Sequence, residues 1–232
     1  GPGLGDLTNF LVDVKSVEAF EVDTDLCRLL QEEFKKEIDT KQFHLNCGDV
    51  LNAWKGALVD EAYDLVANLP YYIATNIILK ALADPMCKNI LVMVQLEVAE
   101  KFCAVEGEKV FGALSVITQS IGSSHIVVKV PPTAFDPQPK VDSAVFMIQK
   151  NSDRTDSDFE DFLRFAFKQP RKTLMKNLSQ KYDKEKLLVA YEKLNLTQTI
   201  RPHQVCTSDY HQLYKITNKG SLDGRRETRE CN

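Results

Sequence analysis

Two hydrophobic periods alternate along residues 1–150 of the chain. Short apolar runs that end in polar or turn residues are typical of buried strands, whereas apolar residues at every third or fourth position predict amphipathic helices. We expect strands within residues 17–23, 43–51, 63–72, 89–96, 125–130 and 143–148, and helices within residues 7–14, 26–34, 77–82 and 112–121. Strands that alternate with helices predict an α/β fold with a doubly wound sheet.

The pattern changes at residues 151–156, where the composition turns polar, as is typical of a domain boundary. Ser157 and Ser208 are suited to cap helices of the segment that follows. Only helices are predicted there, over residues 159–167, from about residue 171, over 187–194 and over 208–214. We therefore predict an α/β domain over residues 1–150, a helical domain over 151–220 and a polar, disordered tail over 221–232.

The most informative stretch is Asn68-Leu69-Pro70-Tyr71-Tyr72, which follows a predicted buried strand. In an open α/β sheet, ligands bind at the carboxyl ends of the strands, so we expect this stretch at the edge of an active site. Pro70 favours an extended backbone at Leu69 and has no N–H group, which lets the Leu69 carbonyl point outward beside the Asn68 amide. Two acceptors then face one point, and Tyr71 offers a flat ring for stacking.

Two acceptors and an aromatic ring suit the exocyclic amine of a planar base, and adenine is the obvious candidate. Its amine attacks poorly because its lone pair is delocalised into the ring, so a catalyst must hold the amine and stabilise the charge that develops on it. Asn68 Oδ1 and the Leu69 carbonyl can do this without a strong base. The alternative is a strand-end turn with a helix cap and a core tyrosine.

Two earlier strand ends suit a nucleoside cofactor. The glycines of residues 1–5 precede the first predicted helix, and such a turn lets a ligand approach the backbone closely. Glu21 ends a strand about 20 positions later, where a carboxylate can accept both hydroxyls of a ribose. Asp49 ends the next strand, where it can accept from an adenine amine while the following N–H group, that of Val50, donates to the ring. Glu21 could instead cap the next helix, although Asp23 suits that role better.

Composition favours a globular protein, with 44% hydrophobic and 27% charged residues. The sequence has no apolar run of the roughly 18 residues that a membrane span needs and no signal-peptide pattern, so we expect a cytoplasmic protein. The six cysteines and four histidines show no spacing typical of a zinc site, a disulfide framework or a catalytic triad. We expect reduced cysteines and no metal.

Charge is distributed unevenly between the two parts of the chain. Residues 1–149 hold 12 Lys and Arg against 21 Asp and Glu, a net charge of −9, whereas residues 150–232 hold 17 against 12, a net charge of +5. Affinity for phosphate depends on local patches, so the C-terminal third is expected to contact nucleic acid. A solvated helical surface would give the same pattern. Arg171 and Lys172 belong to the basic cluster within residues 164–186.

Eight short motifs follow one another along the chain. They are GPGLGDLT (residues 1–8), EVD (21–23), GDV (48–50), NLPYY (68–72), VQLEVA (94–99), FGALSV (111–116), Phe135 with PQPKVDSAV (137–145), and RKTL (171–174). In this combination the chain resembles the KsgA (RsmA) family of ribosomal RNA small-subunit adenine N6-dimethyltransferases over essentially its whole length. Each motif alone is weak, but eight in this order are a strong signal.

The resemblance implies a class I methyltransferase (Rossmann-like) fold that binds S-adenosylmethionine, beside a helical RNA-binding domain. Glu21 would take the ribose hydroxyls of the cofactor, Val22 would pack on its adenine, and Asp49 would hold the adenine amine. The glycines would pass close to the methionine part. The cofactor-binding residues implied are Gly1, Gly3, Glu21, Val22, Asp49, Val50 and Asn68.

For the substrate, the resemblance implies that Asn68 and Leu69 hold the target N6. Tyr71 would stack on one face of the target base and Phe135 on the other. Catalysis would thus rest on Asn68, Leu69 and Tyr71, while Arg171 and Lys172 would contact phosphates of the RNA.

The sequence departs from the family at two places. Members of the family have, ahead of the glycines, a strand that ends in an acidic residue and, before it, an N-terminal segment that helps to close the cofactor site. We expect this first strand and the N-terminal segment to be absent from the sequence given. Pro170 stands before Arg171 where the family usually has a second arginine, which is expected to weaken one phosphate contact.

The function that the resemblance implies is dimethylation of two adjacent adenosines in a 3′-terminal hairpin loop of small-subunit ribosomal RNA during ribosome assembly. The enzyme would be a monomer without a metal ion or a membrane partner. The closest alternative is a large-subunit RNA methyltransferase of the erythromycin-resistance type. Leu69 and residues 137–145 resemble the KsgA family more than this type. A non-catalytic assembly or transcription factor that retains the fold is a further alternative. A DNA adenine methyltransferase is disfavoured because no DNA-reading domain is evident.

Overall fold

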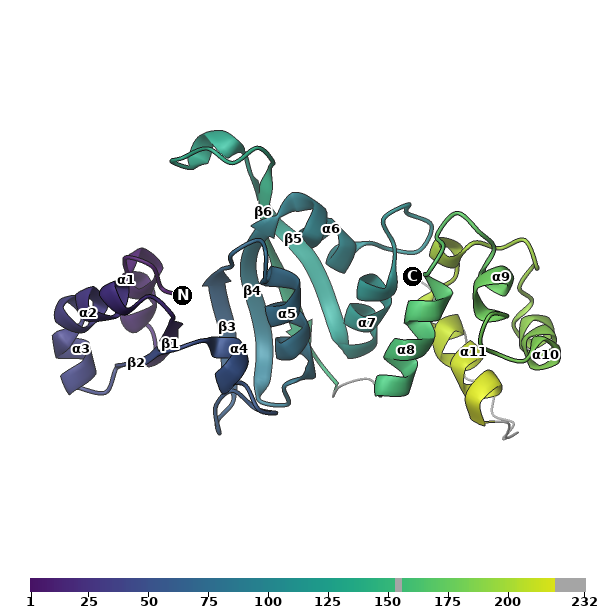
Figure 1. The fold of residues 1–232 in the computed structure, drawn as a ribbon, viewed down its shortest axis with the longest axis horizontal. Coiled ribbons are helices and arrows are strands. Elements are labelled where there is room, and N and C mark those ends of the chain that lie inside the picture. Colours follow the sequence, from purple (N-terminus) through teal and green to yellow (C-terminus); the bar gives the residue numbers. More distant parts are fainter. Residues whose placement is uncertain (153–155, 220–232) are drawn as a thin grey trace. The chain divides into compact units, whose positions relative to one another are not determined.

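The computed structural model describes residues 1–152 and 156–219 of the chain. These residues form two compact units, one built from residues 1–95 and 127–147, the other from residues 96–126 and the described residues after 147 (Figure 1). The predicted tail over residues 221–232 lies outside the described residues. The domain boundary near residue 150 stays a prediction.

The first unit begins with a two-stranded parallel sheet and short helices. Its elements are α1 (Asp6–Val12), β1 (Val17–Glu21), α2 (Thr24–Glu33), α3 (Lys35–Asp39), β2 (Phe43–Cys47) and α4 (Val50–Ala53). Leu30, Phe34 and Phe43 form its buried centre. Asp23 caps α2 as predicted, because its carboxylate accepts from two backbone N–H groups of the first turn.

A second sheet has the strand order β3–β4–β6–β5. Its elements are β3 (Tyr63–Asn68), α5 (Ala74–Ala83), β4 (Cys87–Gln95), β5 (Gly122–Val130), the 3₁₀ turn η1 (Pro132–Ala134) and β6 (Ser143–Lys150). β3 and β4 run parallel, and α5 packs against β4. Within the described residues no ladder joins β1 or β2 to this sheet.

One disulfide corrects the prediction that the cysteines are reduced. Cys27 in α2 and Cys47 at the end of β2 are paired, with Cα atoms 6.1 Å apart. The parallel register places Cys47 opposite Glu21. Helix α2 begins shortly after Glu21 and carries Cys27, so the two cysteines meet in space although they are 20 positions apart. The spacing does not reveal this pairing because it depends on which strands are neighbours. Cys87, Cys103 and Cys206 keep reduced thiols, as predicted.

The second unit is helical in its C-terminal part, as predicted. Its helices are α6 (Leu96–Cys103), α7 (Ala113–Ile121), α8 (Ser157–Ala166), α9 (Leu174–Leu178), α10 (Lys184–Leu194), the 3₁₀ turn η2 (Pro202–Gln204) and α11 (Thr207–Lys219). The two predicted serine caps are wrong. Asp156 caps α8, because its extended backbone and its carboxylate suit the position before Ser157, and Ser208 lies inside α11.

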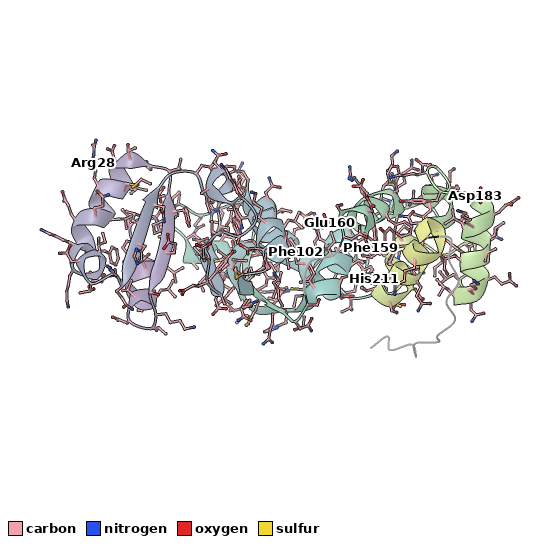
Figure 2. All side chains as sticks on the ribbon, turned by 90° about the horizontal axis from the view of Figure 1, so that it is seen from below. Arg28, Phe102, Phe159, Glu160, Asp183 and His211 are labelled. Atoms are coloured by element: carbon pink, nitrogen blue, oxygen red, sulfur yellow. A yellow bond between two sulfur atoms is a disulfide. The ribbon has the colours of Figure 1, made fainter. Side chains whose placement is uncertain are left out.

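Aromatic packing joins α8 to α11 within this unit. The rings of Phe159 and His211 are stacked with centroids 4.2 Å apart, and Figure 2 labels both side chains. Ser120 Oγ in α7 donates to the Val116 carbonyl at 2.7 Å and lies 2.8 Å from His211 Nε2. Since the hydroxyl proton of Ser120 is already used, Nε2 of His211 carries a proton and donates to Oγ. Burial, helped by the charge of Lys215, lowers the pKa of His211, which keeps the ring neutral.

Within the described ranges, no helix has the length and apolar character that crossing a membrane requires.

Candidate active site

The predicted substrate site lies where β3 ends. Asn68 is the last residue of β3 and is paired with Met93 of β4, and the Leu69 N–H donates to the Met93 carbonyl at 3.1 Å. The side chain of Leu69 is buried, so the backbone here is fixed on both sides. The Asn68 side chain is exposed, and among the described residues neither its amide nor the Leu69 carbonyl has a hydrogen-bond partner. Two open acceptors therefore lie on adjacent residues of a rigid strand end.

The alternative interpretation of this stretch, a helix cap with a core tyrosine, is wrong. The helix that follows, α5, has Ile73 at its N-cap position and no side-chain cap. Tyr71 is 36% exposed and is therefore not a core residue. Tyr72 is more exposed still, so neither tyrosine is needed to fill the interior.

Tyr71 links two motifs that are far apart in the sequence. Its hydroxyl lies 2.8 Å from Oγ of Ser143, the first residue of β6, 72 positions further along the chain. Ser143 is fully buried. Sequence reasoning included Ser143 in a motif but gave it no role, because nothing in the sequence shows that β6 starts beside the turn after β3.

Phe135 is half-buried and directly follows η1, with its N–H donating to the Pro132 carbonyl at 3.1 Å. The described residues include no ring contact between Phe135 and Tyr71. The structure thus brings Tyr71 to Ser143 but not to Phe135. The stacking role of Phe135 stays a prediction.

The predicted cofactor residues lie at the carboxyl edge of the parallel β1–β2 pair. Glu21 is only 6% exposed, and its Oε1 accepts from the N–H groups of Val22 at 2.9 Å and Asp23 at 3.0 Å. Its other oxygen faces Gly1 so closely that a Cβ there would collide with it. Val22, by contrast, is 71% exposed, which leaves an uncovered apolar side chain beside the carboxylate.

Asp49 lies on the neighbouring strand end, because the Gly48 N–H donates to the Glu21 carbonyl at 2.7 Å. One carboxylate oxygen of Asp49 caps α4 by accepting from Leu51 N at 2.8 Å. Among the described residues, the second oxygen of Asp49 and the N–H of Val50 have no partner. An acceptor and a donor are thus available side by side, as one edge of an adenine ring requires.

These residues fit the nucleoside part of S-adenosylmethionine. The Glu21 carboxylate suits the hydroxyls of a ribose, and the exposed Val22 side chain suits the face of a base. The Asp49 carboxylate, with the N–H next to it, suits the edge of that base. Gly3 has a φ of 60°, which favours glycine, and a Cβ built there meets nothing within 4 Å, so the turn is open. Among the described residues, no three His, Cys, Asp or Glu side chains are grouped as metal ligands.

Comparison with known proteins decides which family this chemistry belongs to. The model of the family described as ribosomal RNA adenine dimethylase matches residues 1–219. The chain belongs to this family. A ribosomal RNA small subunit methyltransferase A from Sulfurimonas denitrificans is 74% identical over 231 residues, which cover 100% of this chain and 86% of that relative. The resemblance inferred from the eight motifs is confirmed.

Solved structures support the fold predicted for this dimethylase family member. A dimethyladenosine transferase from Plasmodium falciparum matches with a TM-score of 0.79 and 23% identity, and a 23S rRNA methyltransferase, ErmE, with a TM-score of 0.70 and 22% identity. Each comparison covers 94% of this chain and 88% of the solved chain. At this identity the likeness concerns the fold, and the predicted class I methyltransferase fold is confirmed.

The predicted phosphate contacts of this family member lie in the second unit. Arg171 and Lys172 are exposed in the loop between α8 and α9, and among the described residues neither side chain has an ion-pair partner. Fully buried Asn177 holds this loop: its Nδ2 donates to the carbonyls of Ala166 at 2.7 Å and Gln169 at 3.1 Å. Sequence reasoning missed Asn177, although an amide between the apolar residues of a short helix is a signal that could have indicated it.

Proposed function

We propose that this protein transfers methyl groups from S-adenosylmethionine to N6 of two adjacent adenosines in a 3′-terminal hairpin loop of small-subunit ribosomal RNA during ribosome assembly. The observation that carries the proposal is the pair of open acceptors, the Asn68 amide oxygen and the Leu69 carbonyl, at a rigid strand end in a chain of the dimethylase family.

The two acceptors determine what the site can do with an adenine. Asn68 Oδ1 and the Leu69 carbonyl accept the two hydrogens of N6, which fixes the amine and draws its lone pair out of conjugation with the ring. As N6 bonds to the methyl carbon, the bond from that carbon to sulfur breaks and a neutral thioether leaves, so the positive charge passes to N6 and both oxygens stabilise it. The proton that N6 then releases is acidic enough to pass to water. The monomethylated amine keeps one hydrogen, so the same acceptors can hold it for a second transfer.

Tyr71 and the basic loop supply the remaining substrate contacts. A base reaches the site only when it is flipped out of the RNA stack, and an aromatic ring beside the acceptors replaces part of the lost stacking. Tyr71 is exposed enough to offer a ring face, and we assign Phe135 to the other face of the base. Arg171 and Lys172 hold phosphates of the RNA, which gives a salt-dependent share of the affinity.

The cofactor residues hold the methyl donor beside this site. When bound, S-adenosylmethionine supplies an electrophilic methyl group on its sulfonium. Glu21 would accept from the ribose hydroxyls, Val22 would pack on the adenine ring, and Asp49 with the Val50 N–H would pair with the edge of that ring. Gly1 and Gly3 keep the turn open for the methionine part. We place the enzyme in the cytoplasm as a monomer without a metal ion.

Parallel methylation of the two ribosomal RNAs tests the proposal. The chain is incubated with S-adenosylmethionine carrying a labelled methyl group and with small or large subunits that lack the modification, and the RNA is digested to nucleosides. N6,N6-dimethyladenosine in the small subunit alone is the expected product. Label confined to large-subunit RNA would instead assign the erythromycin-resistance type of activity. Binding to the small subunit without any transfer would identify a non-catalytic assembly factor.

A further inference from the structure

The ring of Tyr71 is tied at both ends. Its backbone lies in the turn after β3, where the Pro70 carbonyl accepts from the N–H groups of Ile73 at 3.2 Å and Ala74 at 3.0 Å. Its hydroxyl lies 2.8 Å from Ser143 Oγ. A tyrosine that is 36% exposed would otherwise sample several rotamers, whereas this one is fixed at Cβ and at Oη.

The anchor for the hydroxyl is rigid. Ser143 starts β6, which lies between β4 and β5 in the sheet, and its side chain is fully buried. Ala144, Phe146 and Ile148 of the same strand are also fully buried, so β6 cannot shift without disturbing the interior. The Tyr71 hydroxyl is the hydrogen-bond partner that the structure gives to Ser143 Oγ. If Tyr71 rotated away, a buried hydroxyl would lose this bond, which opposes the rotation.

The hydrogen bond between Tyr71 and Ser143, called the tether below, matters because stacking requires the ring to stand in one orientation. Ordering a free side chain at the moment of binding costs conformational entropy, and a side chain that is already held avoids that cost. A flipped base also gains from a ring that stands at a fixed angle to the acceptors of Asn68 and Leu69. The same hydrogen bond therefore couples the position of the ring to the sheet that presents the acceptors.

We propose that Ser143 is a positioning residue for the methyl transfer: it holds the Tyr71 phenol so that the ring is oriented for the target adenine before the RNA arrives. In this role Ser143 acts through Tyr71, whose hydroxyl its Oγ contacts, and is assigned no contact of its own with substrate or cofactor. This inference rests on the proposed function and adds a residue to which sequence reasoning gave no role.

A double-mutant cycle tests the tether. Ser143→Ala removes the anchor, Tyr71→Phe keeps the ring and removes the hydroxyl, and the double variant removes both. We expect each single variant to lower kcat about fivefold, since one neutral hydrogen bond is lost. The KM for RNA should stay within about twofold, because phosphate contacts carry most of that affinity. The double variant should be no slower than the slower single variant, since the two groups act as one unit.

Ser115→Ala is the matched control. Ser115 is also fully buried, and its Oγ donates to the Lys101 carbonyl at 2.7 Å and accepts from Gly112 N at 3.0 Å, remote in sequence from the methyl-transfer motif. We expect Ser115→Ala to lower the melting temperature without lowering kcat. If Ser143→Ala behaves in the same way, or if the effects of Ser143→Ala and Tyr71→Phe multiply in the double variant, Ser143 has a structural role alone and the proposal is wrong.

A second readout separates this proposal from the proposed function. The target adenosine of an RNA hairpin is replaced by 8-vinyladenosine, a fluorescent analogue that keeps the N6 amine and is quenched when an aromatic ring stacks on it. We expect the complex with Ser143→Ala to be brighter than the wild-type complex, and the complex with Ser115→Ala to match the wild type. Equal brightness of the Ser143→Ala and wild-type complexes would overturn the tether even if wild-type methyl transfer is intact. A wild-type chain that transfers no methyl group but shows the difference would contradict the proposed function and not the tether.

Discussion

The two ends of β3 treat polar groups in opposite ways. At the amino end, the fully buried Asp84 carboxylate accepts from Tyr63 Oη at 2.8 Å, Trp54 Nε1 at 2.9 Å, and the N–H groups of Leu58 and Met86, each at 2.8 Å. Burial alone would raise the pKa of Asp84, but these hydrogen bonds outweigh it and hold the pKa below the usual 3.8. The carboxylate is thus charged and fully used within the fold.

At the carboxyl end of β3, the acceptors are left open. The Asn68 amide and the Leu69 carbonyl make no hydrogen bond within the described residues, although the backbone around them is fixed to β4. Satisfied polar groups hold the amino end of this strand in place, whereas the carboxyl end leaves two acceptors unused, and we assign these to the target base. This contrast predicts that substitutions at the two ends have separable effects, on stability at one end and on methyl transfer at the other.

The largest expected effect belongs to Asn68→Ala. Removal of one of two oxygens that stabilise the charge on N6 should lower the rate of methyl transfer by about 10²–10³-fold. Thermal unfolding should stay near wild type, because the amide supports no contact in the described part of the fold, and affinity for RNA should fall by no more than several-fold. Transfer of labelled methyl to small subunits measures the rate. Asn76→Ala, an exposed asparagine on α5, is the control and should keep full activity. Equal losses of rate and of unfolding free energy in Asn68→Ala would remove the distinction between the two ends.

The next largest effect is expected at the opposite end, from Asp84→Ala. Four donors lose their acceptor, among them the buried Trp54 indole and the partly buried Tyr63 hydroxyl. The free energy of unfolding should therefore fall by about 3 kcal/mol. Urea denaturation followed by circular dichroism measures this loss. Asp60→Ala, an exposed carboxylate of the loop before β3, should unfold at the wild-type urea concentration. A variant of Asp84 as stable as the wild type would show that this network does not hold β3.

The contrast also explains what the sequence could and could not predict. The period of apolar residues predicted the strands and helices well, and the Asn68-Leu69-Pro70 pattern predicted open acceptors because Pro70 determines local backbone geometry. The Asp84 network, the Cys27–Cys47 disulfide and the Tyr71–Ser143 hydrogen bond were not predictable. Each joins segments at least 20 positions apart, and which segments meet depends on strand order.

The second unit also contains polar groups that are not used within the fold. Arg171 and Lys172 have no ion-pair partner in the described residues, so they are available to phosphates. Replacing both with Ala should reduce the slope of log affinity against log salt by about 1.4, which corresponds to two phosphate contacts with a single strand. Fluorescence anisotropy with an RNA hairpin at several salt concentrations measures the slope. Lys193→Ala, in the last turn of α10, serves as the control, and an unchanged slope in the double variant would show that other residues hold the phosphates.

The smallest expected effect concerns a satisfied group of the helical unit. The pKa of His211 is lowered from 6.5 by burial and by Lys215, so the unfolded chain binds a proton at a higher pH than the folded chain does. Stability should therefore be complete above pH 6.5 and decline as the pH falls below that value towards the folded pKa. Urea denaturation between about pH 7.5 and 5 measures the decline, which His211→Gln should reduce. His44→Gln, an exposed histidine of β2, should leave it unchanged, and a decline of the same size in both variants would contradict the role of His211.

Asn68, together with the Leu69 carbonyl, is proposed to hold the amine of the target adenine. This role is tested by comparing the affinity of the wild type and of Asn68→Ala for two RNA hairpins, one with adenosine and one with purine riboside, which lacks the amine, at the target positions. The wild type should bind the adenosine hairpin several-fold more tightly, and Asn68→Ala should lose most of that preference, because the amine and the amide oxygen are partners. The same preference in both proteins would contradict the account.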